Sequence, residues 1–323
     1  MASKNIEILL TEYEEKRRRK EIEFDKRREE IYAKIPRLAE IENEINKNSI
    51  DKTRAILNGS KNIEEFNQRN LKLLEEKEKI VKKENIELKI KYECNNCKDT
   101  GYVKDKNGRT VMCNCLKQKL INLSYNQSNL SDIEKDNFEN FNENLFSDEG
   151  KKSARKNINT IKKASLKFIE EFDNKNTKNL LFTGNTGLGK TYMSNCIANE
   201  LLKKGKNVLY QTAPVLLETI IDNKFNKYNN QNSDEFYNNI LTVDLLINDD
   251  LGAECLNSMK VSELFTILNT RILNLNNKIT KTIISTNLSI EQIFKIYEER
   301  IGSRIAGYYD IYQFFGDDLR LKK

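Results

Sequence analysis

Eight consecutive residues, Gly184 to Thr191, have the types and spacing of a phosphate-binding loop. They read Gly-Asn-Thr-Gly-Leu-Gly-Lys-Thr, follow a short apolar run at 179–183 and precede a stretch of helical character at 192–203. Glycines let backbone N–H groups curl around phosphate oxygens, and a helix N-terminus adds the positive end of its dipole. With a strand before it and a helix after it, this pattern predicts a nucleotide site.

The two residues that end the loop have separate predicted roles. Lys190 is expected to reach the β- and γ-phosphates, and Thr191 to place its hydroxyl on Mg²⁺. We therefore expect ATP and Mg²⁺ as cofactors. All eight loop residues are predicted to contact the nucleotide: Gly184, Asn185, Thr186, Gly187, Leu188, Gly189, Lys190 and Thr191.

A pair of carboxylates ends a second apolar run, at 243–250. Asp249 is placed to join Thr191 in holding Mg²⁺, and Asp250 to orient or deprotonate the attacking water. Aspartate pairs at strand ends are also common in turns. The phosphate-binding loop earlier in the chain favours the catalytic interpretation.

Four further polar residues are candidates for the same site. Asn287 ends a third apolar run at 281–287, and a side-chain amide there can position the hydrolytic water. Arg300 and Arg304 are four residues apart and share one helix face. An arginine fork suits a transferring phosphoryl group and can come from a neighbouring subunit. Arg320 could reach the phosphates from the C-terminal end, although each arginine taken alone also suits a surface salt bridge.

Four of the six cysteines form two closely spaced pairs, separated by a segment that contains Asn107-Gly108. Asn-Gly between β-like runs predicts a hairpin, which would bring the pairs together. Four thiolates match a tetrahedral, structural zinc site, and the alternative is four unrelated reduced cysteines. Cys196 and Cys255 lack paired spacing and are predicted to be core residues. The predicted zinc ligands are Cys94, Cys97, Cys113 and Cys115.

The N-terminal part of the chain is rich in Glu, Lys and Arg and is predicted to form helices. The first predicted helix ends before Pro36, and a second, short one runs over 51–57 with Ser49 as its cap. A third begins near Asn62, where Glu65 completes a capping box. Helices this charged bury only a narrow stripe, so they pack with one another or with a partner.

The elements that position the nucleotide site begin near residue 151, where short apolar runs alternate with helical stretches. This alternation predicts a parallel α/β sheet flanked by helices. Phe138 and Phe141 are expected to order the end of a linker against this domain. The predicted divisions are a helical region at 1–90, a zinc-binding unit at 91–120, a linker at 121–150 and an ATPase domain at 151–323.

The composition excludes several functions. The chain has no histidine, which removes histidine catalysis and histidine metal ligands. No run of about 18 apolar residues is present, so we expect no membrane span and a cytoplasmic location. The net charge of +6 is small beside 55 basic and 49 acidic residues, and it permits a nucleic-acid partner without requiring one.

The motifs together resemble those of bacterial replicative helicase loaders of the DnaC/DnaI type. The resemblance rests on the phosphate-binding loop, Leu245–Glu254, Ser285–Asn287, Arg300–Arg304 and the Gly-Asp-Asp-Leu-Arg segment at 316–320. It implies an AAA+ ATPase fold preceded by a small zinc-binding unit and an α-helical N-terminal region. Asn248 departs from the pattern, since relatives usually have an aliphatic residue there.

The resemblance implies an ATPase that places a hexameric replicative helicase on single-stranded DNA, with its N-terminal region bound to the helicase. Arg304, with Arg300 as second choice, would act across subunits of an ATP- or partner-dependent homo-oligomer near the nucleoid. Relatives often have Glu at position 250, so hydrolysis is expected to be slow and partner-regulated. A DNA contact is expected at 224–228. The alternatives are a transposition helper ATPase of the insertion-sequence type, and a nucleotide-gated adaptor with negligible hydrolysis.

Overall fold

The computed structural model describes residues 2–57, 63–124, 136–148, 153–225, 233–274 and 278–321. The chain divides into two compact units, one of residues Leu10–Val111 and one of Met1–Leu9 with Met112–Lys323. In the part of the chain described, no helix combines the length and the apolar character needed to cross a membrane.

The larger unit is built on a five-stranded sheet in the order β4-β5-β6-β3-β7. Every neighbouring pair is parallel, as predicted. Strand β6 lies between β3 and β5, so the ends of the three strands that carry candidate site residues lie next to one another. The strands are β3 (Asn179–Thr183), β4 (Val208–Thr212), β5 (Leu245–Leu251), β6 (Lys281–Thr286) and β7 (Tyr309–Gln313).

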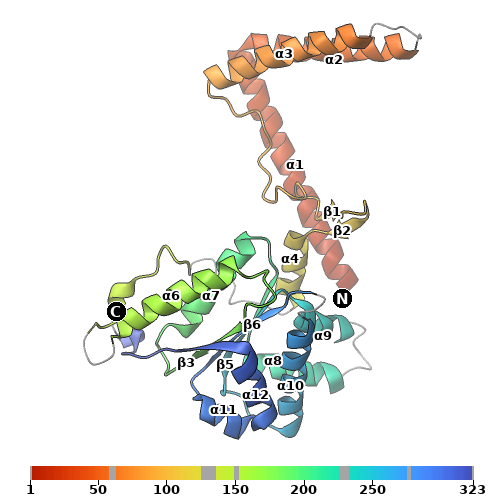
Figure 1. The fold of residues 1–323 in the computed structure, drawn as a ribbon. Coiled ribbons are helices and arrows are strands. Elements are labelled where there is room, and N and C mark those ends of the chain that lie inside the picture. The colour runs from red at the N-terminus through yellow and green to blue at the C-terminus, as the bar shows by residue number, and fades with distance from the viewer. Residues whose placement is uncertain are drawn as a thin grey trace. The chain divides into compact units, whose positions relative to one another are not determined.

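Helices cover both faces of this sheet (Figure 1). Within β3, Leu180 and Phe182 pack in one core cluster and Leu181 packs in another, because successive strand residues point to opposite faces. A strand buried on both faces explains the unbroken apolar run in the sequence. One face carries α6 (Ala154–Glu170) and α7 (Lys190–Lys203); the other carries α8 (Ala213–Phe225), α9 (Ser233–Thr242), α10 (Ser258–Asn274), α11 (Ile290–Ile296) and α12 (Glu298–Tyr308).

Helix α4 (Asn114–Ser124) continues into the segment that the sequence suggested was a linker. Ile121 is 8% exposed and belongs to a core cluster of the larger unit. The Gln118 amide donates to Val208 O at 2.9 Å and accepts from Val208 N at 2.8 Å, which satisfies the backbone of edge strand β4. Residues 121–124 are therefore helical, and Ile121 packs on the core of the larger unit.

The stretch 136–148 contains a short 3-10 helix, η1 (Glu143–Leu145), and packs on the α6–α7 face of the sheet. Phe138 and Phe141 contact the core there, as predicted. Phe146, which the sequence analysis did not single out, is more deeply buried at 6% exposure. Three separated aromatic residues thus hold this stretch against the ATPase core.

The smaller unit contains most of α1 (Ala2–Lys34), together with α2 (Pro36–Leu57) and α3 (Ile63–Lys83). The break at Pro36 is confirmed. The prediction of a separate helix over 51–57 is wrong, because α2 continues without interruption and Ser49 Oγ donates to Ile45 O at 2.8 Å instead of capping a new helix. The predicted start at Asn62 lies outside the described residues.

Helices α2 and α3 pack with each other along their narrow apolar stripes. Leu38 and Ile41 are fully buried, and Leu73 is 8% exposed. Asn48 Nδ2 donates to Asn70 Oδ1 at 2.8 Å, and Arg37 pairs with Glu76 at 2.8 Å. These contacts agree with the first of the two interpretations of the charged helices, in which they pack with one another.

Candidate nucleotide site and cysteine cluster

The predicted phosphate-binding loop connects β3 to α7. Gly184 and Gly187 have φ of 132° and 77°, values that favour glycine. A Cβ on Gly187 would lie 1.8 Å from Asp318 Oδ1, and one on Gly184 would lie 2.2 Å from Phe314 O. The C-terminal segment therefore packs so closely against the loop that both positions require glycine.

Lys190 begins α7 and is 6% exposed. Its Nζ donates to Gly184 O and Asn185 O, each at 2.7 Å, and to Asn287 Oδ1 at 2.8 Å. Burial lowers the pKa of Lys190, while Asp250 and Asp249 act in the opposite direction. Asn287 reaches this lysine because β6 is the direct neighbour of β3 in the sheet.

Asp249 is 2% exposed at the end of β5 and accepts three side-chain hydrogen bonds. Thr191 Oγ1 donates to Asp249 Oδ2 at 3.0 Å, Tyr210 Oη donates to the same oxygen, and Ser285 Oγ donates to Oδ1. Thr191 and Asp249 thus present two adjacent oxygen ligands, the kind that Mg²⁺ prefers. Neither the Tyr210 contact nor the Ser285 contact was predicted from sequence, although Ser285 belongs to the Ser285–Asn287 segment on which the family resemblance rests.

Asp250 lies in a β-bulge between Asn248 and Leu251, where the β5–β6 register shifts. Its φ of 55° turns its side chain away from the path of the strand, and its N–H donates to Ser285 Oγ at 3.1 Å. Desolvation and then the neighbouring Asp249 raise the pKa of Asp250. Bulges commonly redirect a side chain in this way.

Asn248 is 1% exposed, and neither of its amide atoms has a hydrogen-bond partner among the described residues. Burial of an unpaired amide costs free energy. The departure from the aliphatic pattern therefore has a local cost, while Asp249 beside it keeps its full set of partners.

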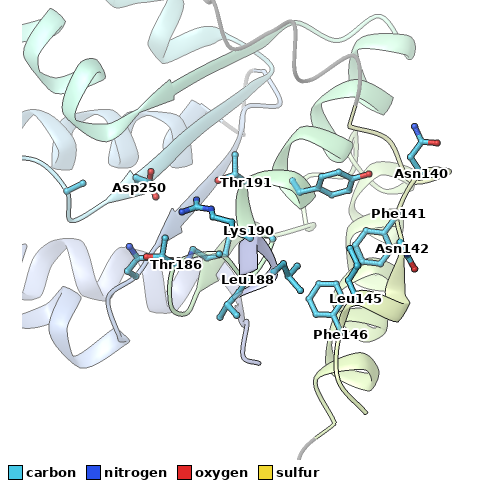
Figure 2. A pocket seen from close by; sticks show the side chains of 17 residues that line it. Asn140, Phe141, Asn142, Leu145, Phe146, Thr186, Leu188, Lys190, Thr191 and Asp250 are labelled. Atoms are coloured by element: carbon cyan, nitrogen blue, oxygen red, sulfur yellow. Dashed lines mark hydrogen bonds between the residues drawn. The ribbon is translucent and has the colours of Figure 1, made fainter. Parts of the chain in front are cut away.

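A cavity of about 610 Å³ adjoins the loop, a size within the range of small-molecule sites. Figure 2 shows Phe141, Leu145 and Phe146 on one side and Lys190 and Thr191 on the other. The remaining lining residues include seven that were predicted from sequence: Thr186, Gly187, Leu188, Gly189, Asp250, Asn287 and Arg320.

The aromatic wall of this cavity comes from residues that precede the predicted ATPase domain. The Phe141 ring lies 6.1 Å from the Phe146 ring and 6.0 Å from the Tyr192 ring, centroid to centroid. Tyr192 Oη donates to Asn137 O at 3.0 Å, and Asn195 Nδ2 donates to Asp136 Oδ2 at 2.9 Å. Helix α7 thus holds the wall in place, a contact that sequence spacing cannot reveal.

Arg300 and Arg304 do not line the cavity. Both lie on α12, where Arg300 pairs with Glu298 at 2.8 Å and stacks 4.9 Å from the centre of the Phe265 ring. Arg304 lies 6.0 Å from the centre of the Tyr308 ring. Within one chain, the structure therefore brings Arg320 to the phosphate-binding loop and leaves these two arginines outside the cavity.

The predicted DNA-binding segment at 224–228 is described only in part. Lys224 Nζ pairs with Glu263 at 2.5 Å and lies 5.2 Å from the centre of the Tyr237 ring. Residues 226–228 lie outside the described residues. The one described cation of this segment is therefore paired within the chain.

The four predicted metal-binding cysteines converge, with all Sγ atoms within 4.8 Å of one another. The predicted hairpin joins them, with strands β1 (Tyr102–Lys104) and β2 (Thr110–Met112) and with Gly108 at φ 76°. A tetrahedral zinc with bonds of about 2.3 Å requires sulfur atoms about 3.8 Å apart, so the cluster fits that metal.

Asp99 stabilises the turn that carries the first cysteine pair, a role not anticipated from sequence. It is 4% exposed, and its carboxylate accepts from Glu93 N at 3.0 Å and Cys94 N at 2.8 Å. The Lys98 N–H donates to Cys94 O at 2.8 Å. These bonds fix the backbone around the cysteines.

The other two cysteines differ from each other. Cys196 is fully buried in α7, as predicted, and burial raises its pKa to about 12. The prediction for Cys255 is wrong, because this residue lies exposed in the loop that follows β5.

The parallel sheet, the glycine loop at a helix N-terminus and the carboxylate pair on the second strand away from it define a P-loop ATPase domain of the AAA+ type. A model of the IstB-like ATP binding protein family matches residues 120–305, more than half of the chain. The chain belongs to this family.

Sequence similarity to DnaC agrees with the resemblance to DnaC/DnaI-type loaders. The replicative helicase loader DnaC of Escherichia coli (strain K12) is 28% identical over 148 residues, 46% of this chain and 57% of DnaC. The phage-like element PBSX protein XkdC of Bacillus subtilis (strain 168) is 25% identical over 225 residues, 67% of this chain and 79% of XkdC. A crystal structure of the DnaC helicase loader gives a TM-score of 0.46 at 20% identity, covering 57% of this chain and 99% of that one. The match to DnaC thus spans 57% of that loader's length.

Proposed function

We propose that this protein is an ATP-dependent loader that places a replicative DNA helicase on single-stranded DNA. The observation that carries the proposal is the DnaC-like ATPase segment, in which the groups needed for hydrolysis surround one cavity. The Cys₄ cluster and the helical unit that precede this segment favour the loader over other members of the family.

In this proposal the residues of the loop, 184–191, hold the phosphates of ATP. Lys190 leaves its two loop carbonyls to contact the β- and γ-phosphates, and Thr191 and Asp249 hold Mg²⁺, which when bound neutralises charge on those phosphates. The aromatic wall at Phe141 and Phe146 receives the base. Arg320 contacts the phosphates from the C-terminal side.

The hydrolytic step is assigned to Asp250 and Asn287. Asp250 accepts a proton from the attacking water, and desolvation together with the neighbouring Asp249 raises its pKa, which makes the carboxylate a stronger base than an ordinary aspartate. Asn287 orients that water once Lys190 turns to the phosphates. The short side chain of Asp250, and the bonds that hold Lys190 to the loop carbonyls, are both consistent with slow turnover that a partner regulates.

The site is completed by a neighbouring copy in a homo-oligomer. Arg304, with Arg300 as the second candidate, is proposed to act across the interface, since both lie outside the cavity of their own chain. Zinc at Cys94, Cys97, Cys113 and Cys115 would stabilise the unit that links the helicase-binding helices at 1–90 to the ATPase domain. A cytoplasmic, nucleoid-associated location follows from this role.

A native-mass measurement of the chain mixed with its host's replicative helicase tests the proposal. We expect a complex whose stoichiometry changes on addition of Mg·ATP. We also expect the chain to transfer the helicase to single-stranded DNA that is coated with single-stranded-DNA-binding protein. Absence of a complex both with and without ATP would refute the loader function.

Family membership favours one second candidate, a transposition helper ATPase of the insertion-sequence type. That candidate predicts binding to a transposase and to double-stranded DNA in place of the helicase. A third candidate, a nucleotide-gated adaptor, predicts the helicase complex with no measurable ATP turnover. The same mixture, assayed for phosphate release, separates these outcomes.

A further inference from the structure

The loop that follows Asp250 is tied to the end of strand β6. Ala253 N donates to Asp250 O at 3.1 Å, which closes a turn, and Thr286 Oγ1 donates to Leu251 O at 2.5 Å. Ala253 also lines the nucleotide cavity. The position of this loop is therefore coupled to the position of Asp250.

Glu254 closes the same loop with its side chain. It is 9% exposed; one carboxylate oxygen accepts from Gly252 N at 2.9 Å and the other accepts from Tyr297 Oη. A Cβ on Gly252 would lie 2.8 Å from Leu288 Cδ1, so the loop fits tightly against the segment after β6. The buried carboxylate thus has one partner in its own loop and one on a distant element.

Tyr297 is that distant partner, and it stands at the junction of two helices. It is fully buried, ends α11 through a bond from its N–H to Ile293 O at 2.9 Å, and directly precedes α12. Burial, followed by the bond to Glu254, raises the pKa of Tyr297 above its ordinary range, so the hydroxyl remains a donor.

The junction is tightly turned and closely packed around Tyr297. Glu298 has a φ of 66°, which few non-glycine residues adopt, and Gly302 is so close to Phe294 that a Cβ there would lie 2.6 Å from the ring. Helices α11 and α12 therefore pack closely against each other, and the Glu254–Tyr297 bond links the pair to the loop beside Asp250.

We propose that Glu254 and Tyr297 are positioning residues that couple the Asp250 loop to helix α12, and so aim the arginines of α12 at the nucleotide of a neighbouring copy. Arg300 and Arg304 lie three and seven residues after Tyr297. A shift of the α11–α12 pair moves both guanidinium groups together. This inference rests on the proposed function, because it requires hydrolysis across subunits.

Tyr297→Phe tests the coupling with little change in packing, since it removes only the hydroxyl. We expect unchanged affinity for ATP and a kcat reduced by between about 10-fold and about 100-fold, as a misplacement of ~1 Å can cost ~100-fold. Tyr312→Phe is the matched control, a half-buried tyrosine on β7 of the same domain that should keep wild-type kcat. Glu254→Gln, which keeps an acceptor for Tyr297, should retain more activity than Glu254→Ala.

A mixing experiment identifies the subunit on which the bond acts. Wild-type chain is diluted into an excess of Asp250→Asn carrier, which binds ATP and presents its own α12, and phosphate release per wild-type subunit is measured. A carrier that also has Tyr297→Phe should reduce that rate by at least about fivefold. Equal rates with both carriers would overturn the inference, whereas absence of turnover in the wild type alone would overturn the proposed ATPase function and the inference with it.

Discussion

Replacement of Phe141 by alanine should weaken nucleotide binding. Phe141 lines the cavity and lies within about 6 Å of two other aromatic rings, Phe146 and Tyr192. Loss of stacking of an aromatic side chain on a base costs ~1–3 kcal/mol. Since 1.4 kcal/mol corresponds to about tenfold in an equilibrium constant, the Kd for ATP should rise between about 5-fold and about 140-fold.

The assay is an equilibrium titration with a fluorescent ATP analogue, competed with unlabelled ATP, at a temperature where every variant is folded. Phe138→Ala is the control. Phe138 lies in the same stretch and packs on the same core, yet it does not line the cavity. Both variants should lose stability, and only Phe141→Ala should lose affinity. An unchanged Kd for Phe141→Ala, or an equal loss for Phe138→Ala, would refute the assignment of this wall to the base.

Four other changes have expected outcomes. Lys190→Ala should raise the Kd for ATP at least about 30-fold, because loss of one partner of a buried charge pair costs ~2–5 kcal/mol. The Kd is measured at a temperature where the variant is folded, since the change also removes the hydrogen bonds of Lys190 within the site. Asp250→Asn should keep ATP affinity and lower kcat by about 10²–10⁴-fold. The base must be ionised and its pKa is raised, so kcat of the wild type should fall on acidification at a higher pH than it would with an ordinary aspartate. The variant should lack this acidic decrease in its pH profile. Cys113→Ser should abolish binding of one zinc equivalent, measured by metal analysis, and leave the Kd for ATP unchanged. Asn248→Leu should raise the free energy of unfolding in urea by about 1–3 kcal/mol, because it removes a buried amide that has no partner.

Local patterns were enough to predict a parallel sheet and the phosphate-binding loop, but not every strand. Strand β3 was predicted at its observed bounds because a run of 5 residues followed directly by a glycine loop has the length of a buried strand and is too short for a helix. The hairpin between the cysteine pairs followed from Asn-Gly. Strand β4 was not predicted, because its residues 208–212 mix apolar and polar types at the sheet edge. Edge strands of this kind have a weaker periodic signal.

The side chains that support the site could not be predicted, because their partners are distant in the sequence. Tyr210 and Ser285 reach Asp249 from neighbouring strands, 39 and 36 residues away. The helix prediction at 51–57 failed for a different reason. Ser49 is a good cap in isolation, but its hydroxyl bonds the preceding turn once α2 packs against α3.

The aromatic wall limits how this ATPase can be passed between proteins by gene rearrangement. A recombination breakpoint at residue 151, where the α/β pattern begins, would transfer the phosphate-binding loop and leave Phe141 and Phe146 behind. A breakpoint upstream of Asp136 would transfer the wall with the residues of α7 that hold it. If the wall receives the base as proposed, the smallest segment that transfers the whole nucleotide site begins upstream of the first residue of the sheet domain. A new upstream module acquired by such a protein would then be joined next to the wall of that site.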